Sequence, residues 1–169
     1  YKRQEYVSRM KEDQKVIYYA AGDTVDKIDK LPQLEALKDQ GVEILYFREE
    51  VDEFVPQTLN TYMEKPFCNV TTEDLGLQSE EEKKEAEEKA EEMKGFLTFV
   101  KESLGDQVKE VRLSQNLGSY PAAMVPEAGM SFEMEKYMKR VNPEFAYPVG
   151  RVLELNPEHE TVKQLVELM

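Results

Sequence analysis

The sequence predicts a mixed α/β fold, in which a three-layer α/β unit with a small parallel sheet is joined by a long charged helix to a second, α+β unit. Three observations support this. Through residues 1–78, short β-branched and aromatic runs alternate with helical patterns. Residues 79–104 combine a dense run of charge with a regular apolar stripe. Over residues 105–169, strand and helix patterns follow one another without regular alternation.

The first unit begins with a helical pattern and continues with strand-like runs at 16–20, 42–47 and 67–70. Between the first two runs, a helical pattern restarts at Pro32 and stops at Gly41. Asp52 is placed to cap a further helix. The order strand–helix–strand–helix–strand requires parallel pairing with right-handed crossovers. We therefore expect a three-stranded sheet with helices on both faces.

The charged segment 79–104 is predicted to form one continuous helix. Ser79 and Glu82 have the spacing of a capping box, and Gly105 stands where the helix would end. Its first half is almost entirely charged, whereas its second half is apolar enough to pack on a neighbouring element. The alternative is a disordered acidic linker followed by a short helix. The apolar stripe favours the helix because it persists through the charge, at Ala86, Ala90, Met93, Leu97, Val100 and Leu104.

The second unit contains strand-like runs at 108–114, 122–125 and 151–155. Ser131 can cap an intervening helix that covers residues 132–140. At the end of the chain, Asn156 is expected to act as an N-cap with Pro157 at the first helical position. The apolar stripe of this last helix comprises Val162, Leu165, Val166 and Met169.

Several stretches of the sequence carry a resemblance to a known family. They include EYVSRMKEDQKVIYYAAGD at 5–23, KLPQLEALKDQGVEILYF at 30–47 and VDEFVPQTL at 51–59. These three stretches resemble the end of the middle domain of the heat shock protein 90 chaperones, bacterial HtpG type. KEVRLSQNLGSYPAAMV at 109–125 and RVLELNPEHETVK at 151–163 resemble the family's carboxy-terminal domain. The resemblance implies a fragment containing the end of the middle domain, a connecting helix and most of the carboxy-terminal domain, cut before the final dimerisation helices.

The same resemblance implies a function. We expect the client-binding and scaffold portion of an ATP-dependent chaperone that binds partly unfolded proteins. The full-length protein would be a homodimeric ATPase that uses ATP and magnesium, whereas this fragment would lack the ATPase domain and hold no cofactor. The alternative is a purely structural or dimer-assembly module without client contact of its own.

The residues expected to contact clients lie in two places. By its pattern Phe54 is most simply a core residue, but it and Gln57 follow an acidic cluster, where the resemblance implies an aromatic residue that contacts clients. An amphipathic helix near 131–141 also resembles a client-contact element, with candidates Met130, Met134, Tyr137 and Met138. Methionine suits surfaces that accept many partners, although a methionine stripe is also typical of an ordinary core. We expect this face to be partly exposed, and near-zero accessibility at Met134 and Met138 would contradict that.

Composition argues against several other classes of protein. The net charge is −13 and no segment is basic, which argues against a nucleic-acid partner. No apolar run is long enough to span a membrane, and no signal peptide is evident. Cys68 is the only cysteine, so we expect a reducing, cytoplasmic location. His159 has no second ligand at metal-binding spacing, and no catalytic constellation or phosphate-binding glycine loop is present.

Overall fold

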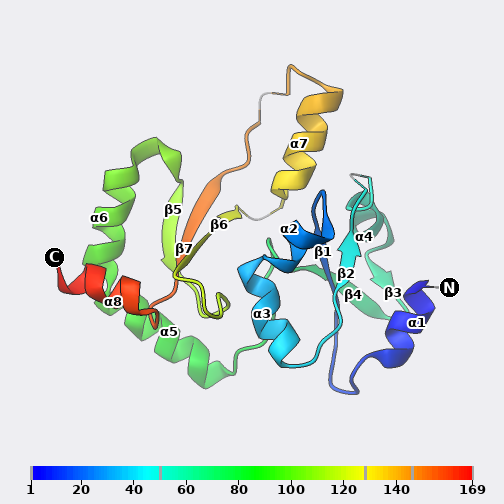
Figure 1. The fold of residues 1–169 in the computed structure, drawn as a ribbon, viewed down its shortest axis with the longest axis horizontal. Helices are drawn as coiled ribbons and strands as arrows, with labels where there is room; N and C mark the ends of the chain where they lie inside the picture. The colour runs from blue at the N-terminus through cyan, green and yellow to red at the C-terminus, as the bar shows by residue number, and fades with distance from the viewer. Residues whose placement is uncertain (1, 50, 128, 146, 169) are drawn as a thin grey trace.

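The computed structural model describes residues 2–49, 51–127, 129–145 and 147–168, with side chains placed from residue 5 onward. The fold is mixed α/β, with two small mixed sheets far apart along the chain and helices around them (Figure 1). The first sheet belongs to the N-terminal half and the second sheet to the C-terminal half. The predicted fold class is therefore correct at the level of a mixed α/β fold.

The first sheet has the strand order β2-β1-β4-β3. Its central strand β1 (Ile17–Ala21) pairs in parallel with β2 (Leu45–Phe47) and with β4 (Lys65–Asn69). These are the three expected strands, although β2 is only the last part of the predicted run. The sequence did not reveal β3 (Thr61–Tyr62), a short antiparallel strand that pairs with β4. The sheet is therefore mixed and not purely parallel.

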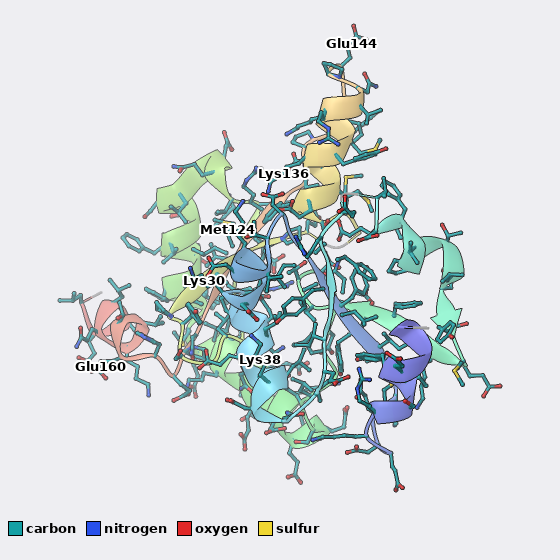
Figure 2. The ribbon with its side chains drawn as sticks, turned by 45° about the vertical axis from the view of Figure 1, so that its right-hand side comes forward. Lys30, Lys38, Met124, Lys136, Glu144 and Glu160 are labelled. Atoms are coloured by element: carbon teal, nitrogen blue, oxygen red, sulfur yellow. The ribbon has the colours of Figure 1, made fainter. Side chains whose placement is uncertain are left out.

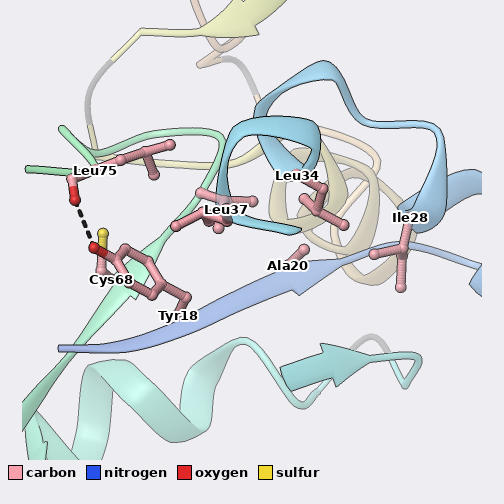
Figure 3. Packing of buried hydrophobic residues seen from close by; sticks show 8 residues of the cluster. Tyr18, Ala20, Ile28, Leu34, Leu37, Cys68 and Leu75 are labelled. Atoms are coloured by element: carbon pink, nitrogen blue, oxygen red, sulfur yellow. Dashed lines mark hydrogen bonds between the residues drawn. The ribbon is translucent and has the colours of Figure 1, made fainter. Parts of the chain in front are cut away.

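Helices pack on both faces of the first sheet because successive side chains of β1 point to opposite sides. Tyr18 and Ala20 face a core cluster that includes Ile28 of α2 (Val25–Asp29), together with Leu34 and Leu37 of α3 (Pro32–Asp39) (Figure 3). Ile17 and Tyr19 face the other way, toward Tyr6 of α1 (Lys2–Arg9). Pro32 begins α3 at its first turn, as expected.

The segment predicted as one long helix is two helices. α5 (Glu80–Glu92) ends and α6 (Lys94–Leu104) begins at Met93, whose φ of −90° and ψ of 6° belong to a turn and not to a helix. Burial accounts for the break, since α6 packs Phe96 into the core of the second sheet, whereas α5 has no buried residue. Gly95 lowers the helical preference just after the break.

The start of α5 and the end of α6 lie where the sequence predicts the ends of this helical segment. Ser79 Oγ accepts a hydrogen bond from the Glu82 amide at 3.2 Å, and the Glu82 carboxylate accepts one from the Ser79 amide at 2.7 Å. The capping box is therefore confirmed. At the other end, Gly105 has a φ of +55° and leads into the 3-10 turn Gly105–Gln107.

The second sheet has the order β5-β7-β6, formed by β5 (Glu110–Leu113), β6 (Ala122–Pro126) and β7 (Arg151–Leu155). The central strand β7 is parallel to β5 and antiparallel to β6. α6 and α8 (Glu160–Glu167) pack against this sheet through a core cluster of Phe96, Val108, Val111, Leu155 and Val162. α7 (Phe132–Val141) follows β6 and extends away from this core (Figure 1).

The predicted start of the last helix is wrong. His159 is the N-cap of α8, where its Nδ1 accepts a hydrogen bond from the Thr161 amide at 3.1 Å. Asn156 instead secures the preceding turn, because its side-chain amide donates to the carbonyls of Gly118 at 3.0 Å and Tyr120 at 3.2 Å. The Asn156 Oδ1 also accepts from the Glu158 amide at 3.0 Å, so Asn156 caps the turn before α8 and not the helix itself. Met169, expected on the stripe of α8, lies outside the described residues.

The turn secured by Asn156 lies against α3, so it joins the two halves of the molecule. The amide and the hydroxyl of Ser119 donate to the Glu35 carboxylate at 3.1 and 3.0 Å. Gly118 permits this approach, because its φ is +52° and an added Cβ would meet the Glu35 carboxyl carbon at 2.6 Å.

We expect Gly118→Ala to lower the free energy of unfolding more than Gly76→Ala. Both glycines have positive φ, but a Cβ at Gly76 would contact nothing within 4 Å. The two variants share the backbone strain, so the difference, about 1 kcal/mol for two lost hydrogen bonds, reports the contact with Glu35. Urea unfolding of both variants measures it, and equal losses would contradict a stabilising role for this contact.

Candidate functional site

The predicted site residues from the two halves of the chain meet where α7 approaches α4 (Phe54–Leu59). The rings of Phe54 and Tyr137 make an edge-to-face contact, with centroids 5.4 Å apart and planes at 67°. Gln57 Nε2 lies 3.5 Å from Met134 Sδ, a weak donor–acceptor contact. We call these four residues, with Glu53 and Ser131 beside them, the junction.

Glu53 is the polar centre of the junction. Its side chain is 3 % exposed, and its carboxylate accepts hydrogen bonds from the Ser131 hydroxyl and from Asn69 Nδ2, the latter at 3.0 Å. Ser131 in turn caps α7, since its Oγ accepts from the Met134 amide at 3.0 Å. One carboxylate therefore links the start of α4, the end of β4 and the start of α7.

The residue at the N-cap of α4 is Glu53 and not the predicted Asp52, and it makes no side-chain cap bond to α4. The Asp52 carboxylate instead accepts from the Glu49 amide at 3.2 Å in the preceding turn. Sequence reasoning missed Glu53 because an acidic residue at a helix start is usually solvated. Its burial and its bond to Ser131, 78 positions later, follow from tertiary packing alone.

Burial raises the pKa of the Glu53 carboxyl above its usual value. The hydrogen bonds from Ser131 and Asn69 act in the opposite direction, whereas the nearby Glu133 carboxylate adds to the increase. The folded protein therefore holds a proton on Glu53 more tightly than the unfolded chain does.

The methionine face of α7 is only partly accessible. Met134 is 6 % exposed and is therefore covered, whereas Met138 keeps part of its exposure, so the expectation of a partly exposed face holds for Met138 and not for Met134. Met134 is covered because this end of α7 lies against the first-sheet half, where Gln57 contacts its sulfur. Met130, Tyr137 and Met138 are half-buried, as is Phe54, and Gln57 is exposed.

A second buried carboxylate, Glu135, attaches α7 to the segment that leads into β7. Its Oε1 accepts from Lys139 Nζ at 2.7 Å and from the Val149 amide at 3.2 Å. Burial acts to raise the pKa of Glu135, but these donors outweigh it and the pKa is lowered. Glu135 is therefore held in its charged form.

The far end of α7 extends away from both sheets, with Glu144 near its tip (Figure 2). Val141 is 63 % exposed and Tyr147 is 79 % exposed, and the rings of Phe145 and Tyr147 lie 6.0 Å apart. The sequence places Val141 on the apolar face of α7, but sequence analysis did not single out Phe145 or Tyr147. The available signal was two aromatic residues in a proline-containing segment without strand or helix periodicity.

Comparison with known proteins identifies the family. The family model described as "Hsp90 protein" matches residues 2–169. The chain belongs to the Hsp90 family. It is 45% identical over 161 residues to the chaperone protein HtpG of Bacillus velezensis, which covers 95% of this chain and 26% of that relative.

Two other relatives show the same extent of similarity. The HtpG of Clostridium acetobutylicum is 48% identical over 156 residues, which is 92% of this chain and 25% of the relative. The HtpG of Bacillus subtilis is 44% identical over 161 residues, which is 95% of this chain and 26% of that relative. This Hsp90 chain thus spans about a quarter of the length of the curated relatives it matches.

The other reactive side chains have structural surroundings. Cys68 is buried, and burial raises the pKa of its thiol to about 12, which leaves it unreactive at neutral pH. Within the part of the chain that the structure describes, no group of three His, Cys, Asp or Glu side chains could hold a metal ion. None of the helices in those same ranges has the length and apolar character needed to cross a membrane.

Replacing Glu53 by glutamine imitates its protonated form and should change how stability depends on pH. Because the folded pKa is raised, the stability associated with Glu53 is full below its unfolded pKa and is lost as pH rises through the folded pKa. We therefore expect the free energy of unfolding of Glu53→Gln, relative to that of the parent, to become more favourable as pH rises above the ordinary glutamate pKa and less favourable below it.

Urea unfolding at a series of pH values measures this trend. Glu49→Gln is the matched control, since it removes an exposed carboxylate from the same loop. A difference between Glu53→Gln and the parent that stays constant with pH would show that Glu53 is not a buried titrating group.

We expect Phe54 and Tyr137 to be energetically coupled through their ring contact. A double-mutant cycle with Phe54→Leu and Tyr137→Leu should give a coupling free energy of about 1 kcal/mol in urea unfolding. Phe54→Leu combined with Val141→Leu is the control, because Val141 is exposed at the far end of α7. Additive effects in both pairs would exclude a stabilising ring contact.

Proposed function

We propose that this chain is a client-contacting and scaffold part of an Hsp90-family chaperone and that it binds partly unfolded proteins along α7 and α4. The observation that carries the proposal is the arrangement of α7. One end is attached to the first-sheet half through Glu53 and Ser131, while the other end exposes apolar side chains such as Val141. A surface that binds many unfolded segments weakly needs exposed apolar groups on a rigid support.

The burial of each candidate residue divides the proposed surface into two parts. Met130, Tyr137 and Met138 are half-buried but keep some exposure, and in this proposal they form the contact surface with Phe54 and with exposed Gln57. Met134 is buried, and in this proposal it serves to anchor α7 and does not touch the client. Met138 and Met130 offer flexible, polarisable side chains that adapt to different apolar partners.

The alternative is a structural module in which these apolar residues only hold the two halves together. The contacts of Phe54 with Tyr137 and of Gln57 with Met134 favour it, because the candidates partly cover one another. The two proposals differ in whether Met130 and Met138 respond to an unfolded protein.

Membership in the Hsp90 family supports further proposals about the whole protein. We propose that the chain comprises the end of a middle domain, the connecting segment 79–104 and most of a carboxy-terminal domain. The complete protein would act as a cytoplasmic homodimeric ATPase that binds ATP and magnesium outside these residues. The relatives named above are chaperones, and this chain covers about a quarter of their length.

Methyl-labelled methionine provides the direct test of the function. Titration with a permanently unfolded model protein should shift the NMR signals of Met130 and Met138, while Met134 responds less because it is buried. Methyl signals that stay unchanged with the unfolded protein in excess would refute client contact here and support the structural module.

Met138→Ser should weaken binding of the unfolded protein about fivefold, because a contact worth about 1 kcal/mol is lost. Met63→Ser is the matched control, since Met63 is 58 % exposed and lies in the β3–β4 turn far from α7 in sequence. Affinity measured by fluorescence anisotropy should be unchanged in the control. Equal weakening by both variants would point to unspecific apolar binding.

A further inference from the structure

We propose that the cleft between α5 and β5 binds an extended, basic polypeptide segment, which adds to the open edge of the second sheet through its main chain. The proposal rests on the chaperone function above and specifies a second place, and a conformation, in which a client segment is held. None of the six junction residues lines this cleft.

The cleft has a volume of about 720 Å³ and lies between α5, β5 and the segment that follows β4. Ala86 and Ala90 of α5 face it, and α5 buries no residue of its own. α5 comes close to β5 in places, but its small side chains leave room within the cleft for another backbone to approach. The opposite wall is the continuous run 110–116, which contains β5 and the residues after it.

β5 is an edge strand. In the order β5-β7-β6 it pairs only with β7, so one side of its backbone has no strand partner within the described ranges. Unpaired N–H and C=O groups along an edge are a template for an additional strand. Recognition of this kind is largely independent of client sequence, because the main chain supplies the hydrogen bonds.

Gln33 provides an independent indication that a polar ligand is missing. Its side chain is 5 % exposed and lines the cleft, and its Oε1 has no hydrogen-bond partner among the described residues. A buried carbonyl oxygen without a donor costs about 1–3 kcal/mol. A backbone or side-chain N–H of an incoming segment would satisfy it.

Charge determines which segments fit best. The basic residues of the cleft already have partners, since Lys83 pairs with Glu80 at 3.4 Å, Lys89 with Glu158 and Arg112 with Glu154 at 2.7 Å. Glu87 and Glu110 also line the cleft, and neither forms an ion pair with a described residue. The unbalanced charge is negative, which favours lysine or arginine on the bound segment.

The probe for this site is a synthetic peptide of about eight residues that alternates valine and threonine with lysine, long enough for one strand. We expect saturable NMR shifts of the β5 backbone amides and of the Gln33 side-chain amide. A peptide of equal length and charge with proline at alternate positions lacks the N–H donors, so it should bind about tenfold more weakly. Replacing lysine by glutamate should weaken binding in the same way.

Cleft-filling variants test the location. Ala86→Gln combined with Ala90→Gln should weaken the peptide about tenfold without a change in net charge, whereas Thr98→Gln on an exposed position of α6 should not. Gln33→Leu removes the unpaired acceptor, so it should weaken binding about threefold without lowering the free energy of unfolding.

The outcomes separate this inference from the proposed function. Absence of shifts in β5, or equal binding of the proline peptide, overturns the cleft proposal. If the unfolded protein still shifts Met130 and Met138, the chaperone function stands and only the cleft proposal fails. If the peptide binds β5 as described while those methyl signals stay unchanged, the cleft proposal is supported and the proposed client contact on α7 is refuted.

Discussion

The arrangement of the two halves depends on one buried carboxylate. Glu53 accepts hydrogen bonds from Asn69 at the end of β4 and from Ser131 at the start of α7. Removing a charged group from water is costly, and these donors repay only part of the cost, which is why burial raises the pKa of Glu53. The same bonds fix the direction in which α7 leaves the first-sheet half, and so decide which of its residues are covered.

Further connections limit the movement of one half relative to the other. The turn at Gly118 and Ser119 contacts Glu35 of α3, and α5 runs from the first-sheet half to the second sheet. α5 contributes no buried residue, so it is a connecting helix and not part of a hydrophobic core. The cleft of about 720 Å³ lies where the small side chains of α5 leave space beside the edge strand β5.

The break at Met93 shows how tertiary packing overrides a local pattern. An apolar stripe that continues through 79–104 predicts one straight helix, and the capping box at Ser79 agrees. The two parts of the stripe nevertheless have different surroundings, since Phe96 is buried against the second sheet while Ala86 faces the cleft. The chain bends at Met93 so that α6 can bury its larger apolar area against the second sheet, because that burial contributes more free energy than a straight helix would.

The sequence by itself determined the local elements: the strands centred on 17–20 and 151–155, the caps at Ser79 and Ser131, and the membership in the Hsp90 family. Only the tertiary structure decided that Met134 is covered, that Asn156 secures a turn, and that Glu53 links α4 to α7. The physical reason is the range of the interactions. Caps and apolar periodicity involve residues a few positions apart, whereas what covers an apolar face depends on contacts across the whole chain.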